Sequence, residues 1–165
     1  MRILLFITSL ALPTAAIAQC PSDAEDLFAC TFNNGAKTVT TCFADGAVSY
    51  AFGPTGGASE LELTRDVRDV DMYPWQGIGR WIAEEFTLAN GEYTYAMRYA
   101  IDRLSEDFVI EGDLIVRKGE RVLATLTCDE GSVQTSGYPL PIYDAKVAVG
   151  QIWSNEDFEW KELKQ

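Results

Sequence analysis

Histidine is absent from the 165-residue sequence. Its absence excludes Ser-His-Asp and Cys-His catalytic sites and every metal site that is built on imidazole. The chain also lacks a Cys-x-x-Cys pair, a Gly-x-Ser-x-Gly motif and a glycine-rich phosphate-binding loop. Zinc ribbons, nucleophile-elbow hydrolases and nucleotide-binding folds are therefore not indicated. We expect a protein that is not an enzyme and that carries no metal and no cofactor.

Positive charge is also scarce. The chain has 13 Lys and Arg residues against 25 Asp and Glu residues, which gives a net charge of −12 at pH 7. The acidic residues are scattered along the chain, so they do not form a disordered tail. This balance argues against binding to nucleic acid or to anionic lipid head groups, and it leaves room for a basic protein partner or a bound cation. Solubility in a crowded compartment is the alternative reason for the charge.

Long apolar runs are missing except near the start of the chain. Residues 3–12 form an apolar run that is too short to cross a bilayer, and Arg2 precedes it. Residues 16–18 (Ala-Ile-Ala) fit the small-x-small cleavage rule, so we expect a signal peptide over 1–18. A lipoprotein with Cys20 as the lipidated residue is less favoured, because Gln19 is not small. Residues 19–165 should form one exported domain, periplasmic or secreted, without membrane insertion.

The sequence has four cysteines, all beyond the expected leader. An even number in an exported chain predicts two disulfides, which can pair in three ways. A tight turn at residues 33–35 would place Cys30 opposite residue 38 or 39, too far from Cys42 for a bridge. We therefore favour Cys30–Cys128 together with Cys20–Cys42. A metal or redox site is less favoured, since no histidine could complete it.

Residues 28–53 show the clearest structural pattern. Apolar and polar residues alternate in three short segments, separated by residues 33–35 (Asn-Asn-Gly) and 44–46 (Ala-Asp-Gly). This pattern predicts three antiparallel strands joined by tight hairpin turns. With the later segments it predicts a mainly all-β fold, an antiparallel meander of about eight strands that forms a barrel or a sandwich. The later segments are 59–64, 82–88, 93–101, 108–118 and 121–128, with an irregular strand at 65–72.

The C-terminal part has a different periodicity. Ile142, Ala145, Val149, Ile152 and Trp153 recur at helical spacing. The pattern predicts a C-terminal helix over residues 142–153, packed on the sheet through this apolar stripe.

Residues 73–81 break every pattern and form the candidate binding loop. They include Tyr73, Trp75, Arg80 and Trp81, which are residue types that dominate protein–protein interfaces. One interpretation is a protruding loop that enters the cleft of a partner. The other is a loop that folds back and plugs one end of the fold, and large aromatics are more often buried in this way.

The acidic residues suggest two further kinds of site. Asp66, Asp69 and Asp71, with Glu84 and Glu85 nearby, could in principle bind Ca²⁺, but the spacing does not match an EF-hand loop. A solvated charged edge is the favoured interpretation. A pair of carboxylates could also hydrolyse a glycosidic bond, yet no feature of the sequence selects one pair.

Cys30, Phe32, Gly35, Lys37, Val39 and Cys42 form the run C-x-F-x-x-G-x-K-x-V-x-x-C, which is followed by Tyr-x-Phe-Gly at 50–53 and Glu-Leu-x-Leu at 60–63. This pattern resembles a group of small exported proteobacterial proteins of uncharacterised function. The resemblance implies an envelope protein and supplies no activity. A fainter, fold-level likeness is to the periplasmic inhibitors of lysozyme, in size, compartment, cysteines and negative charge.

Together these features predict a soluble periplasmic protein that binds and does not catalyse. More specifically, the binding protein would inhibit a basic envelope enzyme such as a lysozyme, because opposite charges on the two proteins speed their encounter. A structural or accessory envelope protein is the alternative. A carboxylate-dependent hydrolase is the least favoured function.

Overall fold

The computed structural model describes residues 20–107 and 109–163, so the expected signal peptide lies outside the described residues. The first of two large sheets is an antiparallel meander whose strands follow one another in the sequence. A short strand, β10, returns from late in the chain and pairs with its first strand. The members of this first sheet are β1 (Glu25–Phe32), β2 (Lys37–Ala44), β3 (Ala47–Pro54), β4 (Leu61–Asp66) and β10 (Gln134–Thr135).

The second large sheet is also an antiparallel meander with its strands in sequence order. A short 3₁₀ helix, η1 (Val67–Asp69), carries the chain from β4 to this sheet. The longest strands are the paired β6 and β7, which run in register from Trp81 opposite Asp102 to Asn90 opposite Tyr93. The members of this second sheet are β5 (Asp71–Tyr73), β6 (Trp81–Asn90), β7 (Tyr93–Asp102), β8 (Ile110–Lys118) and β9 (Arg121–Thr127).

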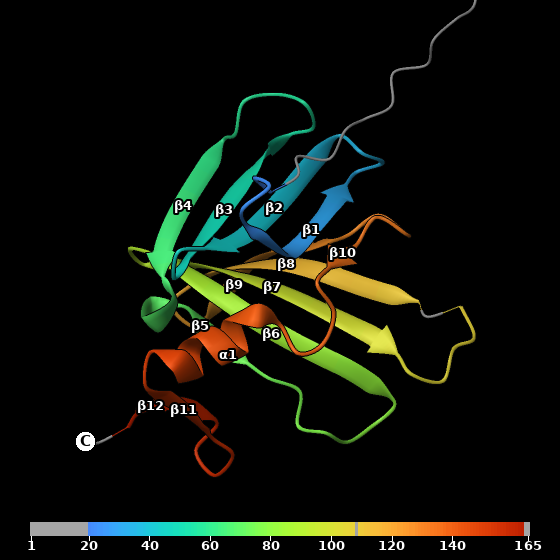
Figure 1. Ribbon diagram of the computed structural model, residues 1–165. Helices are drawn as coiled ribbons and strands as arrows, with labels where there is room; N and C mark the ends of the chain where they lie inside the picture. The colour runs from blue at the N-terminus through green and yellow to red at the C-terminus, as the bar shows by residue number, and fades with distance from the viewer. Residues whose placement is uncertain (1–19, 108, 164–165) are drawn as a thin grey trace, which may run out of the picture.

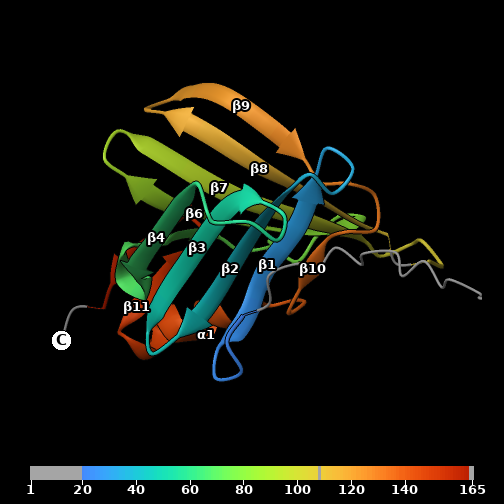
Figure 2. The same cartoon turned by 90° about the horizontal axis from the view of Figure 1, so that it is seen from above.

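The two sheets lie face to face as a sandwich (Figures 1 and 2). The predicted all-β meander is confirmed, and of the two architectures expected, the open sandwich is the one observed. Each sheet turns one face of alternating apolar residues to the other, which is how two antiparallel sheets bury a common core. The fully buried large side chains of this core include Phe28, Phe32, Phe86, Leu88, Met97, Tyr99 and Leu114.

Two disulfides staple the sandwich with the predicted pairing. Cys30 on β1 is bonded to Cys128, just after β9, and this bridge joins the two sheets across 98 residues. Cys20 is bonded to Cys42 on β2, across 22 residues, and pins the start of the described chain to the first sheet. Cys30 lies opposite Val39, as the turn geometry predicts. Two disulfides indicate an oxidising compartment.

The C-terminal helix is shorter than predicted. Helix α1 spans Pro141–Ala148 and ends before Gly150, whose φ of 88° suits a glycine. Residues 152 and 153, which the helical spacing assigned to the helix, lie instead on β11 (Gln151–Ser154), which pairs with β12 (Glu159–Glu162). The helical spacing continues past the break by chance, because Ile152 and Trp153 are consecutive strand residues and lie on opposite faces of β11. Figure 1 shows α1 and this hairpin beside the β5 side of the sandwich.

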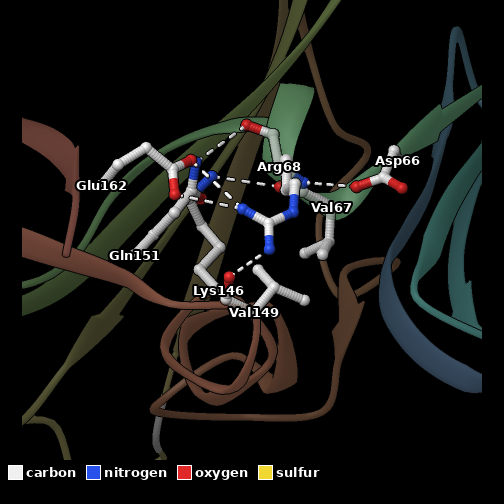
Figure 3. A network of polar contacts seen from close by, with 7 residues as sticks. All are labelled: Asp66, Val67, Arg68, Lys146, Val149, Gln151 and Glu162. Atoms are coloured by element: carbon white, nitrogen blue, oxygen red, sulfur yellow. Dashed lines mark hydrogen bonds and ion pairs between the residues drawn. The ribbon is translucent and has the colours of Figure 1, made fainter. Parts of the chain in front are cut away.

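Polar contacts attach this C-terminal part to η1 (Figure 3). The fully buried Lys146 ammonium on α1 donates to the carbonyl oxygens of Val67, at 3.1 Å, and Val70, at 2.6 Å. The Arg68 guanidinium binds both carboxylate oxygens of Glu162, at 3.2 and 3.1 Å, and also donates to the carbonyl of Val149. The helix and hairpin are therefore docked on backbone carbonyls as well as on apolar side chains. Neither α1 nor η1, the two described helices, is long and apolar enough to cross a membrane.

Candidate functional site

The candidate loop runs from the end of β5 to the start of β6, and its C-terminal end, at Arg80, is anchored to the rest of the protein. Arg80 donates two hydrogen bonds to Asp102, from Nε at 2.8 Å and from Nη2 at 2.5 Å. The carboxyl of Asp102 is almost fully buried, and the hydrogen bond from Arg80 is the main cause that lowers its pKa. Arg80, one of the predicted binding residues, is thus engaged within the chain and holds the loop in place.

Trp75 folds back onto the protein. Its indole Nε1 donates to the carbonyl of Ile78 at 3.0 Å, which closes the loop on itself. The ring meets Tyr138 edge-on, with centroids 5.2 Å apart, and the Arg103 guanidinium lies 5.1 Å from its centroid. Ile78, at the tip, is 78% exposed. The loop therefore anchors itself through Trp75 and presents an apolar tip to solvent.

Tyr73 and Trp81 lie at opposite ends of the loop and have different neighbours. Tyr73 contacts Trp153, at 5.3 Å between ring centroids, and stacks on Phe158 at 6.0 Å. Trp81 is half-buried, and the Arg80 guanidinium lies 5.9 Å from its ring centroid. The structure therefore gathers Tyr73 and Trp75 with aromatic residues from the C-terminal part, and it places Arg80 and Trp81 apart from them.

A pocket of about 400 Å³ opens between this loop and the C-terminal part. Its walls come from the loop, from the segment before α1, from α1 itself and from the hairpin. Among the described residues, no Lys or Arg side chain lines it. The lining residues are Pro74, Trp75, Gln76, Gly77, Glu84, Tyr138, Pro139, Tyr143, Asp144, Trp153 and Asn155.

Glu84 borders this pocket from the core-facing side of β6. It lies directly opposite Tyr99 on β7 and is 1% exposed. Its Oε2 accepts a hydrogen bond from the backbone N–H of Leu140 at 3.0 Å and lies 2.7 Å from the Tyr99 hydroxyl. Its Oε1 has no hydrogen-bond partner among the described residues. A buried carboxyl oxygen without a partner is costly, so it marks a place where a ligand could donate a hydrogen bond.

Burial raises the pKa of Glu84. The hydrogen bonds from Tyr99 and from the Leu140 backbone, together with the nearby backbone N–H of Trp75, oppose this change. Between the ordinary glutamate pKa and the raised value, the folded protein holds a proton that the unfolded chain has lost. The free energy of unfolding should therefore fall as the pH rises through this window, and Glu84→Gln should remove that fall. Urea unfolding of both proteins from about pH 4 to about pH 8 measures it. Parallel curves for the two proteins would contradict the burial effect.

The sequence contained a signal for Glu84 that the acidic-cluster interpretation overlooked. In residues 82–88, Glu84 falls in phase with Phe86 and Leu88, the apolar positions of the strand. Period-two alternation therefore places it on the buried face, away from Glu85 on the other face. Tyr138, Tyr143 and Trp153 carried no comparable signal, because only the folded chain brings them to this loop.

The acidic residues that suggested calcium have other roles, since Asp66, Asp69 and Asp71 act on the Lys146 ammonium. Asp66 accepts a hydrogen bond from the Arg68 backbone N–H and so caps η1, whereas Glu85 pairs with Arg117 at 3.6 Å. Among the described residues, no group of three or more Cys, Asp and Glu side chains is arranged to hold a metal ion.

A second pocket, of about 680 Å³, lies beside the Cys30–Cys128 bridge. Two of its acidic groups are already engaged. Asp113 binds Arg98 and Thr127, and Asp129 accepts hydrogen bonds from Thr31 and from the β1–β2 turn. Although this pocket is larger, none of its described residues has a buried side-chain polar atom that lacks a partner, so the Glu84 pocket is the better candidate site.

The chain matches no protein-family model, no curated protein and no solved structure.

Proposed function

We propose that this chain is an exported, non-catalytic binding protein of the periplasm. It recognises a basic protein through the Glu84 pocket and the tip of the candidate loop, at Ile78. An inhibitor-like role toward a basic envelope enzyme such as a lysozyme is the specific form of the proposal. The leader-like residues 1–18 and the two disulfides support export.

One observation carries the proposal. A pocket with aromatic walls opens beside exposed apolar side chains, and the acidic Glu84 and Asp144 line it without a basic residue among the described ones. On a chain with a net charge of −12, such a surface attracts a basic partner and offers it aromatic anchor points. Ile78 is 78% and Tyr138 46% exposed, and both are available for contact.

Tyr138→Ala should weaken binding to a basic lysozyme by about 10-fold, the effect of removing an aromatic hot-spot residue. Tyr93→Ala is the matched control, because Tyr93 is exposed to a similar extent, 38% against 46%, and lies outside the pocket. Calorimetry and inhibition of cell-wall lysis, at low and high salt, measure both variants. Equal losses in the two variants, or no binding by the unmodified protein at low salt, would refute the proposal.

The second candidate function is a carboxylate-dependent hydrolase. It is favoured by the presence of two carboxyl groups, Glu84 and Asp144, in one pocket. We place it second because Oε2 of Glu84 is already held by Leu140 and Tyr99. Release of sugars from peptidoglycan by the purified protein, lost in Glu84→Gln, would favour the hydrolase over the binding protein.

A further inference from the structure

The two oxygens of the buried Glu84 carboxyl differ in their surroundings. Oε2 is held by the Leu140 N–H and the Tyr99 hydroxyl, whereas Oε1 is without a hydrogen-bond partner among the described residues. The backbone N–H of Trp75 is near enough to lower the pKa of this carboxyl, yet it does not supply that partner. The wall of the pocket therefore contains a buried carboxyl group, 1% exposed, with one acceptor atom that lacks a hydrogen-bond partner among the described residues.

The pocket walls suit a cation. Trp75, Tyr138, Tyr143 and Trp153 all line it, and aromatic faces attract organic cations. The same region already holds one such contact, because the Lys146 ammonium lies 5.1 Å from the centroid of the Trp160 ring. The pocket should select against an anion. Its walls are aromatic, Asp144 lies at its rim, and none of its described lining residues is Lys or Arg.

The single unpartnered oxygen, Oε1 of Glu84, also selects the kind of cation. A guanidinium group prefers two carboxylate oxygens in a fork, and Leu140 and Tyr99 occupy the second oxygen of Glu84. An ammonium group is a compact charge with freely rotating donors and needs only one open oxygen.

We propose that the Glu84 pocket binds an alkylammonium group, of the kind that a lysine side chain carries, in exchange for a proton of Glu84. This inference rests on the proposed function, because it names the ligand group of the same site. The ammonium comes from a lysine of the basic partner or from a free alkylamine, and the test below separates these two sources.

The Tyr99 hydroxyl provides the geometric basis for the exchange. It lies 2.7 Å from Oε2 of Glu84 and 2.9 Å from the carbonyl oxygen of Gly137, but it has only one hydrogen. When Glu84 is protonated, it can donate through Oε2 to Tyr99, and Tyr99 then donates to Gly137. When an ammonium enters, the Glu84 proton leaves to solvent, and Tyr99 turns its hydrogen to the carboxylate. One cation enters for each proton that leaves.

The ionisable groups around Glu84 are consistent with this exchange. They are Tyr99 on β7, Tyr138 before α1, and Tyr143 and Asp144 on α1. None of these four is a cation, and Arg103, whose guanidinium lies against the Trp75 ring, does not line the pocket, so a ligand can supply a positive charge beside Glu84. Burial raises the pKa of Glu84 because it disfavours the charged form, and a cation beside the carboxyl would favour that form.

Titration calorimetry with n-butylamine and with Nα-acetyl-lysine amide tests the inference, with n-butanol and Nα-acetyl-arginine amide as controls. Both amines should bind, and both controls should bind more weakly. Affinity should rise with pH as long as the amine stays protonated. The measured binding enthalpy should change with the ionisation enthalpy of the buffer, because the buffer takes up the released proton.

Glu84→Gln should lower the affinity by about 10-fold or more, the loss of one charge-assisted hydrogen bond. Glu85→Gln, the neighbour outside the pocket, should leave it unchanged.

Glu84→Gln keeps the size of the side chain, and its folding is checked by circular dichroism and thermal unfolding. Asp144→Asn is the second variant, because Asp144 is exposed and its replacement leaves the core intact. It should also weaken amine binding. Equal binding of n-butanol or of the arginine derivative, unchanged binding by Glu84→Gln, or binding without proton release and without pH dependence would overturn the inference.

Acetylating the lysines of a basic lysozyme separates the two sources of the ammonium group. A partner lysine is the source if acetylation abolishes binding, and free alkylamine is the source if n-butylamine binds while lysozyme does not. If lysozyme binding depends on Tyr138 but survives both acetylation and Glu84→Gln, the proposed function stands and this inference fails. If neither the amines nor lysozyme bind, both fail.

Discussion

Replacing Cys30 and Cys128 together by alanine is expected to lower the free energy of unfolding by about 4–5 kcal/mol, because the bridge closes a very long loop. The two cysteines are 98 residues apart and join the two sheets. Without the bridge, the unfolded chain gains the freedom of that loop. A domain of this size is usually stable by only about 5–15 kcal/mol, so the variant should be marginally folded. Urea unfolding at constant temperature measures the loss.

The matched control is the double variant Cys20→Ala, Cys42→Ala, which opens a loop of only 22 residues. We expect it to lose about 3 kcal/mol by the same argument. The ranking of the two losses is the informative result. A Cys30–Cys128 variant that loses no more than the control would mean that sheet packing alone holds the sandwich closed.

Lys146→Ala should be the most damaging of the single substitutions considered, with a loss of about 3 kcal/mol in the free energy of unfolding. The alanine leaves the carbonyls of Val67 and Val70 without their ammonium donor and opens a cavity below Trp160. The loss should be concentrated in α1 and the hairpin, which Lys146 docks on η1 (Figure 3). Urea unfolding measures the total, and hydrogen exchange at residues 141–162 shows whether the loosening is local.

Two further variants separate packing from charge. Lys146→Met keeps the volume and should be less destabilising than Lys146→Ala, whereas Lys161→Ala, on the surface, should have little effect.

Burial lowers the pKa of Lys146, and the nearby carboxylates of Asp71, Asp69, Glu162 and Asp66 oppose this change. Between that lowered pKa and the ordinary lysine value, the unfolded chain binds the proton more strongly, so stability should rise with pH there. A Lys146→Met protein that keeps this rise would show that another group causes it.

Much of the fold was predictable because its signals are local. The turns at residues 33–35 and 44–46 use Asn, Asp and Gly, and Asn33, Asn34 and Gly35 all adopt positive φ. Period-two alternation marked the strands, and the turn geometry led to the pairing of the cysteines. The helix boundary was wrong because 3.6-residue spacing continues by chance into a strand beyond Gly150.

The candidate site was less predictable. Sequence alone selected the loop at residues 73–81, and the structure places Trp75 in a pocket wall but pairs Arg80 with Asp102. Glu84 was identifiable as a buried acid from its phase with Phe86, yet its neighbours were not. Tyr138 and Trp153 are far from it in the sequence, and no local rule brings them together.

By itself, the sequence determined the antiparallel meander, its turns and its disulfide framework, because each depends on residues near one another or on the few partners open to four cysteines. Only the tertiary structure decided that the meander is an open sandwich. It also decided that Asp129, which follows β9 in the sequence, accepts hydrogen bonds from Asn34 and Gly35 in the β1–β2 turn. The tertiary structure further decided that Glu84, at the wall of an aromatic pocket, has one buried oxygen without a hydrogen-bond partner among the described residues. These features arise where distant segments share buried space, and there burial and hydrogen bonding depend on every neighbour at once.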